Sequence, residues 1–429
     1  MISNATVALQ KPHHRKAIFL LIHGWLWISL TNLASGADWP QFLGPDRDGK
    51  VDAVGLVDNL NPDTIRLVWQ TDGGAGMSGM AVAEGLAVTL WNREGQQFLG
   101  ALDIETGKTR WVTAVAPLYR NTMGNGPRAT PTIVDGMIYA HTGEGILVAV
   151  DSMTGKISWR VNTVQENQTR PAEYGMACSP LVWGDRVILH TGGRTSAVCA
   201  YDSKTGEKLW EAGAGSAGYS SPTLQRIDGA EQIVSFVASG LIGIDPHAGR
   251  VLWSYPFETP YDCNTATPVV IGNSVFISAG ENHGCVLLDI QRQGSSYMVA
   301  PKWKSVDSKS VMRNEWQTSI VIDQYLYGFD NVGSAGPVTH FSCLDANTGE
   351  RAWQETRFGK GNLTYADGKF WITTMQGELV LVKADPERYQ ELGRLKLFGK
   401  TRQSLSIADG RGYIRDDQKI YCFDLRKQR

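Results

Sequence analysis

The chain has 429 residues, of which 42% are hydrophobic and 47 are glycine, so it can bury a large core and must make many turns. Its formal net charge is −2, with 41 Lys plus Arg against 43 Asp plus Glu and no long basic run. This balance argues against nucleic acid or an anionic lipid surface as the main partner, because neutralising phosphates needs clustered basic side chains.

Residues 1–37 predict an export signal. A basic stretch from Lys11 to Lys16 precedes an apolar run over residues 17–30, and Ser-Gly-Ala ends at Ala37. The run is shorter than the about 20 residues that a membrane-spanning helix needs, so a retained anchor is the weaker alternative. Cleavage here leaves 38 Lys plus Arg against 43 Asp plus Glu. We expect a periplasmic or secreted protein without a membrane span.

Residues 38–61 are interpreted as a polar leader before the first repeat. The run Asp46-Arg-Asp-Gly-Lys-Val-Asp52 is similar to a calcium loop, but its glycine comes too early and no Glu stands at the twelfth position. The leader therefore predicts no metal site.

The rest of the chain, residues 62–429, carries a repeated phrase whose best copy is Ala101-Leu-Asp-Ile-Glu-Thr-Gly-Lys-Thr-Arg-Trp111. Good copies end at Trp159, Trp210, Trp253 and Trp353, and degenerate copies end at Trp303 and near Leu395. The spacing of about 42 to 51 residues is typical of propeller blades. Each copy predicts two strands joined by a tight turn, where Gly adopts positive φ and the Asp and Thr side chains bind turn amides.

A second element alternates with the first and begins with Thr-Pro or Ser-Pro, as at Thr130, Ser179 and Thr267. Weaker versions begin at Ser78, Ser221, Ser319, Leu363 and Leu405, which makes eight. Each repeat thus supplies about four short strands, and a lone unit of this kind cannot bury both faces. We predict an all-β fold, an eight-bladed β-propeller with four-stranded blades. The Trp strand at 65–69 lacks a preceding turn and is predicted to close the ring against Tyr421–Asp424.

The repeated phrase resembles the tryptophan-docking motif of pyrroloquinoline-quinone (PQQ) repeat propellers over nearly all of residues 62–429. Two branches share that motif: quinoprotein alcohol dehydrogenases, and non-enzymatic propellers related to the lipoprotein that assists outer-membrane β-barrel assembly. The opening phrase Trp39 to Gly49 is also similar to that of short exported propellers whose activities are mostly unassigned.

The resemblance implies that an enzyme of this type usually carries a disulfide between adjacent cysteines, a tryptophan platform and a bound calcium. Adjacent cysteines and any Cys-x-x-Cys-His motif are absent from the sequence. Most of the six cysteines are interpreted as structural, because Cys199, Cys285, Cys343 and Cys422 lie in apolar runs, and a bridge such as Cys263 to Cys285 is left open. We therefore expect a monomeric binding or scaffolding module for an envelope protein segment or a small ligand, with no catalytic residue. A PQQ- and calcium-dependent alcohol or sugar dehydrogenase is the alternative.

Ligands of propellers usually bind at the channel mouth, where the loops that enter the innermost strands converge. The polar and aromatic residues predicted there are Arg128, Tyr174, Asn264, Asn314, Glu315, Trp316 and Arg402. Asn264, Asn314 and Glu315 offer oxygen atoms to a cation such as Ca²⁺. Trp316 offers a stacking face, and Arg128 or Arg402 suits a carboxylate. The alternative is that these loops bind water or backbone and that Trp316 fills a gap between blades.

No other catalytic signature stands out. The histidines after the leader are isolated, without the paired spacing that zinc needs, and His141 and His190 are interpreted as structural. No nucleophile elbow or phosphate-binding glycine loop occurs in the sequence.

Overall fold

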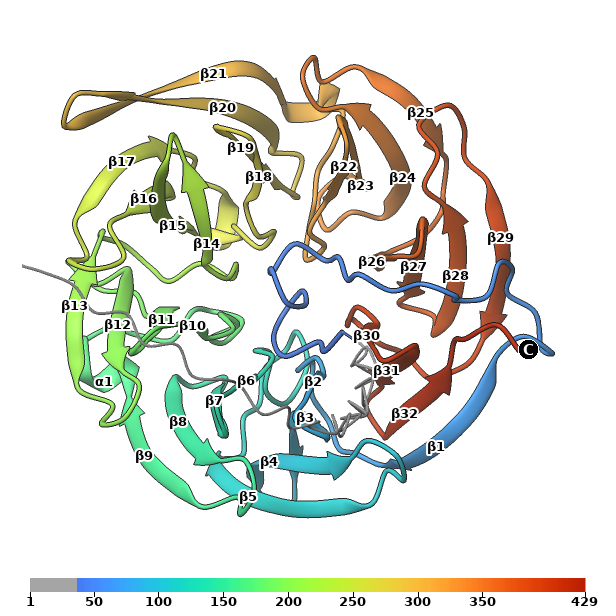
Figure 1. The fold of residues 1–429 in the computed structure, drawn as a ribbon. Coiled ribbons are helices and arrows are strands. Elements are labelled where there is room, and N and C mark those ends of the chain that lie inside the picture. The colour runs from blue at the N-terminus through green and yellow to red at the C-terminus, as the bar shows by residue number, and fades with distance from the viewer. Residues whose placement is uncertain (1–36, 429) are drawn as a thin grey trace, which may run out of the picture. The chain divides into compact units, whose positions relative to one another are not determined.

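The computed structural model describes residues 37–428, which form a ring of eight four-stranded sheets (Figure 1). The predicted eight-bladed propeller is confirmed. The predicted export signal lies outside the described residues except for Ala37. Within residues 37–428, no helix is long and apolar enough to cross a membrane. The helical elements described are α1 (Thr163–Glu166) and two 3₁₀ turns, Pro260–Asp262 and Asp307–Lys309.

The blades follow the chain, and each runs from the central channel to the rim. Blade 1 holds β2 (Ala81–Ala83), β3 (Leu86–Arg93), β4 (Gln96–Asp103) and β5 (Thr109–Pro117). Blade 2 holds β6 (Thr132–Val134), β7 (Met137–His141), β8 (Ile146–Asp151) and β9 (Ile157–Asn162). Blade 3 holds β10 (Leu181–Trp183), β11 (Arg186–His190), β12 (Val198–Asp202) and β13 (Lys208–Ala212). Blade 4 holds β14 (Thr223–Ile227), β15 (Ala230–Val237), β16 (Gly240–Ile244) and β17 (Val251–Pro256).

The second half of the ring continues in the same way. Blade 5 holds β18 (Val269–Ile271), β19 (Ser274–Ala279), β20 (Gly284–Gln293) and β21 (Ser296–Val306). Blade 6 holds β22 (Ile320–Ile322), β23 (Tyr325–Val332), β24 (Val338–Asp345) and β25 (Arg351–Glu355). Blade 7 holds β26 (Gly361–Ala366), β27 (Lys369–Thr374), β28 (Glu378–Lys383) and β29 (Glu391–Lys396). Blade 8 joins β30 (Ser406–Ala408), β31 (Arg411–Arg415) and β32 (Lys419–Asp424) to β1 (Arg66–Asp72).

The repeated Trp and Gly residues pack against each other across blades. An added Cβ on the turn glycine would lie only 2.6–2.8 Å from indole atoms of the preceding blade's Trp, and these glycines have φ between +67° and +77°. Only glycine meets both conditions without strain. The pairs are Trp69–Gly107, Trp111–Gly155, Trp159–Gly206, Trp210–Gly249 and Trp303–Gly349. The indole N–H adds a bond to the next blade's turn, as from Trp69 to the carbonyl of Ile104 at 2.8 Å.

Trp253 departs from this pattern. Its indole N–H donates to Oε1 of Gln232, within its own blade, at 2.6 Å. The next blade lacks the short Asp-x-x-Thr-Gly turn and instead extends β20 and β21 into a long hairpin, which Figure 1 shows along the rim of the ring. Trp253 therefore finds its hydrogen-bond acceptor locally.

The ring closes between the first and last strands, as predicted. In the antiparallel pair of β1 and β32, Leu67 lies opposite Phe423 and Trp69 lies opposite Cys422. Arg415 adds a second link, because its fully buried guanidinium donates to the carbonyls of Leu90 and Gly74 in and before blade 1. Burial lowers the pKa of Arg415 to about 10.

The segment before the first blade is a packed element rather than the polar leader expected from the sequence. Trp39, Val51, Leu56 and Leu60 are buried in one cluster with residues of blades 1, 7 and 8. Trp39 exchanges two backbone hydrogen bonds with Val82. Figure 1 shows this blue segment over the centre of the ring. Its apolar residues are spaced among polar ones without a period, which is why the sequence pattern did not predict the packing.

Candidate functional site

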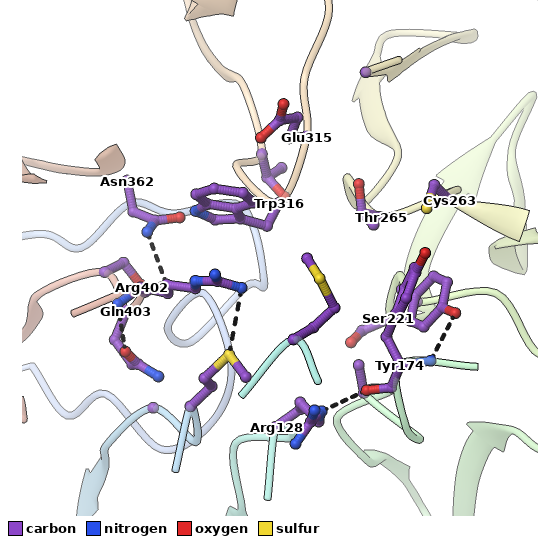
Figure 2. A pocket seen from close by; sticks show the side chains of 18 of the residues that line it. Arg128, Tyr174, Ser221, Cys263, Thr265, Glu315, Trp316, Asn362, Arg402 and Gln403 are labelled. Carbon is purple, nitrogen blue, oxygen red and sulfur yellow. Dashed lines mark hydrogen bonds between the residues drawn. The ribbon is translucent and has the colours of Figure 1, made fainter. Parts of the chain in front are cut away.

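A cavity of about 490 Å³ lies at one mouth of the central channel (Figure 2). Its walls come from the loops that join the outermost strand of one blade to the innermost strand of the next. Phe42 and Leu43 of the leader also line it. The leader pairs with two innermost strands, through Trp39 and Val82 of β2 and through Lys50 and Tyr365 of β26. The leader and the loops therefore line the cavity together, and its volume is in the range of small-molecule sites.

The Thr-Pro and Ser-Pro repeats shape this wall. Thr130 donates its backbone N–H to the hydroxyl of Ser179 at 2.9 Å, and Ser179 donates its own N–H to the hydroxyl of Ser221 at 2.9 Å. The same relation joins Gly79 to Thr130 at 3.2 Å and Thr267 to Thr318 at 3.1 Å. Each hydroxyl thus ties one innermost strand to its neighbour, and this belt holds the loops above it in place.

Arg47 of the leader is also bonded to the channel wall. Its guanidinium is 3% exposed and donates to the carbonyls of Pro180 at 2.9 Å and Ser179 at 3.0 Å. Burial lowers the pKa of Arg47 to about 10. These bonds fix the leader against the start of β10, below the cavity.

Arg402 and Trp316 lie together in the cavity. The guanidinium carbon of Arg402 is 4.9 Å from the ring centroid of Trp316, and Figure 2 shows the guanidinium directed toward the middle of the cavity. Burial lowers the pKa of Arg402. In the described part of the chain, no carboxylate forms an ion pair with Arg402, and the one hydrogen bond of its guanidinium is to Sδ of Met77 at 3.7 Å. The charges of Glu315 and Asp417 oppose the lowering of this pKa from a distance, so the site holds a half-buried cation without a directly bound carboxylate.

Arg128 brings a second cation to the same space. It donates to the carbonyls of Tyr174 at 2.6 Å, Gly124 at 2.8 Å and Gly126, and its guanidinium carbon lies 4.7 Å from the ring centroid of Tyr119. Burial and the charge of Arg402 lower its pKa. The carbonyls hold its position but leave its charge unneutralised.

Glu315 supplies the main negative charge nearby, and it is committed to Lys360 at 2.6 Å. Burial raises the pKa of Glu315, and the ion pair opposes that shift. Lys360 also lies 4.7 Å from the ring centroid of Trp316. The second carboxylate that lines the cavity, Glu281, accepts bonds from the hydroxyl of Ser334 at 2.6 Å and the N–H of Ala335.

Four buried polar atoms of the cavity wall have no hydrogen-bond partner within the described residues: Nε2 of Gln403, Nε1 of Trp316, Oε1 of Glu315 and Oγ1 of Thr265. Buried donors and acceptors are normally hydrogen-bonded, so atoms of this kind mark a place where a ligand or water completes the set. Gln403 is 7% exposed, and its Oε1 already accepts from the N–H of Arg402 at 3.0 Å. Two of the four atoms are N–H donors and the hydroxyl of Thr265 can also donate, so the set suits a ligand with several acceptor atoms.

Tyr174 and Tyr219 form the aromatic wall opposite. Their rings stack with centroids 5.8 Å apart, and the N–H of Tyr174 donates to Oη of Tyr219 at 3.1 Å. Both tyrosines line the cavity.

Five of the seven residues predicted for the site line this cavity: Arg128, Tyr174, Glu315, Trp316 and Arg402. Asn264 and Asn314 do not. The amide of Asn264 donates to the carbonyls of Val237 and Phe257 at 2.7 and 3.1 Å. That of Asn314 donates to the carbonyl of Phe329 at 2.9 Å and accepts from Ser319. The amide oxygen of Asn264 accepts from the hydroxyl of Thr259 at 2.9 Å, so both amides hold their loops and neither oxygen is directed to a cation in the cavity.

The structure adds residues that the prediction did not include. Gln403 follows Arg402, and Met77, Met123, Phe42 and Leu43 supply apolar surface. A loop methionine or a lone glutamine carries no sequence pattern of its own. Lys360 pairs with Glu315 across 45 residues, and no local sequence pattern indicates that pairing.

Comparison with known proteins places the chain in a family. The family model described as outer membrane protein assembly factor BamB matches residues 53–174 and 167–355. The chain belongs to this family of PQQ-like repeat propellers. The resemblance expected from the Asp, Gly and Trp phrase is thereby confirmed.

Individual relatives are distant, and they include proteins of two kinds that share this fold. BamB of Yersinia pestis is 25% identical over 247 residues, which are 52% of this chain and 59% of that protein. The dehydrogenase subunit of a quinone alcohol dehydrogenase of Gluconacetobacter polyoxogenes is 25% identical over 199 residues, 40% of this chain and 25% of that protein. The match thus spans less than two thirds of each of these relatives.

Solved structures show the same fold from both kinds. A europium-containing methanol dehydrogenase covers 91% of this chain, with 98% of its own chain, at a TM-score of 0.66 and 14% identity. BamB from Moraxella catarrhalis covers 85%, with 99% of its own chain, at a TM-score of 0.59 and 15% identity. At these identities the likeness concerns the fold alone.

Proposed function

We propose that this propeller is an exported binding module that takes a carboxylate-bearing ligand at its channel mouth and does not transform it. The observation that carries the proposal is Arg402, a half-buried cation beside Trp316 that forms no direct ion pair with a carboxylate of the described residues. Burying a charge without a partner is costly, and an incoming carboxylate would relieve that cost with charge-assisted hydrogen bonds. Arg128 and the free amide of Gln403 add donors to the same ligand.

The alternative is a dehydrogenase that uses PQQ and calcium. It is supported by relatives that are named dehydrogenases and by the positively charged side chains at the site. Arg402, Arg128 and Trp316 suit the acidic, planar part of such a cofactor, which would supply the redox chemistry. The calcium ligands do not fit. Glu315 and Glu281 are already bound, Asn264 and Asn314 face their own blades, and residues 37–428 hold no cluster of three acidic, His or Cys side chains suited to a metal. This supports binding over turnover.

The relatives named as assembly factors of outer membrane proteins are consistent with a role in the cell envelope. An export signal over residues 1–37 would place the chain there. The partner or ligand then meets the propeller outside the cytoplasm, where the open mouth is free to receive it.

Titration calorimetry with benzoate and citrate tests the proposal. Arg402→Gln should weaken binding at least tenfold, since a hydrogen bond to a charged group contributes about 1.5–3 kcal/mol. Arg120→Gln is the matched control, because Arg120 is exposed on the neighbouring loop and does not line the cavity. Equal affinity in all three proteins would refute the proposal.

A second experiment addresses the alternative. Purified protein is mixed with PQQ, with and without Ca²⁺, and cofactor absorbance and dye reduction with alcohols or sugars are followed. Stoichiometric uptake with turnover would replace the binding module by an oxidoreductase.

A further inference from the structure

Two large apolar side chains remain exposed at the rim of the cavity. Met123 is 45% exposed and Tyr261 is 62% exposed, and both line the cavity. They come from separate loops, between β5 and β6 and between β17 and β18. A small acid held at Arg402 would leave both of them in water. The rim is therefore suited to a ligand that continues out of the pocket.

The loop around Tyr261 is strained. Tyr261 has φ +59° and Asp262 has φ +54°, two consecutive non-glycine residues in the left-handed region. Such conformations cost roughly 1–3 kcal/mol each and are concentrated at ligand clamps and other functional sites. Contacts with the surrounding structure offset this conformational cost and hold the tyrosine at the mouth.

The cavity also continues sideways. A second pocket of about 230 Å³ shares Met77, Met123, Arg402 and Gln403 with the first and adds Lys400 and Asp417. Arg402 thus lies where the two pockets meet. The two pockets together offer more room than a small acid needs, with Arg402 between them and the exposed Met123 and Tyr261 in the wall of the larger one.

Resting on the proposed function, we infer that the ligand is the carboxyl terminus of a polypeptide segment. The terminal carboxylate binds Arg402 and the free amide of Gln403. The last side chain, an apolar one, packs against Trp316 and Met77, and the preceding residues leave past Met123 and Tyr261. Capture of a chain terminus by a fixed set of donors is a known way of binding peptides, because the carboxylate occurs once per chain. The charge of the site and its exposed apolar rim both fit this ligand.

The test uses two synthetic peptides, acetyl-Gly-Ser-Gly-Ser-Gly-Leu with a free carboxylate and the same sequence as its carboxyl-terminal amide. Fluorescence anisotropy of labelled peptide and calorimetry measure the affinity of the full protein. We expect the free acid to bind at least tenfold more tightly than the amide. Arg402→Gln should abolish this difference, whereas Arg120→Gln should preserve it.

A rim variant separates a peptide from a small acid. Met123→Ser should weaken the binding of the free-acid peptide at least threefold more than it weakens the binding of benzoate. If the peptide binds no better than benzoate, or acid and amide bind equally, the inference fails while the proposed function stands. If benzoate, citrate and both peptides fail to bind a protein whose melting temperature is normal, the proposed function and the inference both fail.

Discussion

The guanidinium of Arg402 lies 4.9 Å from the ring centroid of Trp316, although 86 positions separate the two residues in the chain. One residue precedes β22 and the other precedes β30, so they meet only because blades 6 and 8 face the same channel. The aromatic face attracts the guanidinium and limits the conformations of the Arg402 side chain. Less conformational entropy is then lost when a ligand binds.

This relationship predicts the effect of Trp316→Leu. The variant should fold, because Trp316 is only partly buried, but Arg402 should lose its orienting surface. A cation–π contact of about 0.5–2 kcal/mol corresponds to a loss of about two- to thirtyfold in benzoate affinity. Titration calorimetry with benzoate measures this change in affinity.

Trp183→Leu is the control, since Trp183 ends β10 and does not line the cavity. Affinity should then match that of the parent protein. Unchanged affinity in Trp316→Leu itself would assign that side chain to the filling of the gap between blades, the alternative raised by the sequence.

The packing of Trp210 on Gly249 predicts a large loss of stability in Trp210→Ala. The indole is 9% exposed, donates to the carbonyl of Pro246 at 3.2 Å, and covers the turn of the next blade. Removing a buried aromatic side chain should cost about 3–5 kcal/mol in the free energy of unfolding. Urea denaturation followed by tryptophan fluorescence measures it, and an unchanged midpoint would contradict the packing role.

A glycine pair separates crowding from backbone strain at the same interface. Gly249 has φ +68° and its added Cβ would lie 2.8 Å from Trp210, whereas Gly136 has φ +76° and nothing within 4 Å. Both alanine variants should carry the backbone cost, and only Gly249→Ala should add a clash of about 1–3 kcal/mol.

The fold could be predicted because every blade repeats the same Asp, Gly and Trp, and because those residues pack against one another. Closure could be predicted from one Trp strand without a turn and one turn without a Trp strand. The pattern fails at Trp253, where the following blade replaces the short turn by a long hairpin. A repeated motif indicates only the contacts that every blade makes. It therefore does not predict a contact that occurs in a single blade, such as that of Trp253.

The site could be predicted only as a neighbourhood. Arg128, Tyr174, Trp316 and Arg402 lie in loops whose position follows from the ring, and they line one cavity. The role of an individual amide cannot be predicted from the sequence. The amide of Asn264, for example, donates to carbonyls at the end of β15, more than 20 residues earlier, and to a carbonyl of its own loop. The leader was missed for a related reason, since its packing occurs once and has no period.

The leader predicts the effect of Arg47→Met. Its two hydrogen bonds to Ser179 and Pro180 are charge-assisted and buried, so their loss should cost about 3 kcal/mol in the free energy of unfolding. The leader should also detach more often, with faster proteolysis near the exposed Val54. Arg66→Met is the control, because its ion pair with Asp424 lies at the surface and should contribute less than about 1 kcal/mol.

Two buried histidines predict how stability depends on pH. Burial lowers the pKa of His141 to about 4 and that of His190 to about 3, and the charges of Arg47 and His141 lower the latter further. Unfolding returns both rings to ordinary values near 6.5, so below that pH the unfolded state binds protons that the folded state does not. Stability is therefore complete above pH 6.5 and falls as the pH decreases toward 4. The loss should be about 2 kcal/mol per histidine at pH 5.

His190→Leu isolates one of these contributions. His190 forms no hydrogen bond with a side chain of the described residues, so an apolar side chain of similar size removes little beyond a weak contact with the backbone of Ala217. At pH 7.5 the variant should match or exceed the parent in urea denaturation, and between pH 7.5 and pH 5 it should lose about 2 kcal/mol less. His247→Leu is the control, because His247 is exposed, and it should keep the parent's pH dependence. If His190→Leu and the parent lose stability in parallel, His190 is protonated in the folded state, and the buried neutral ring assigned to it beside Arg47 is wrong.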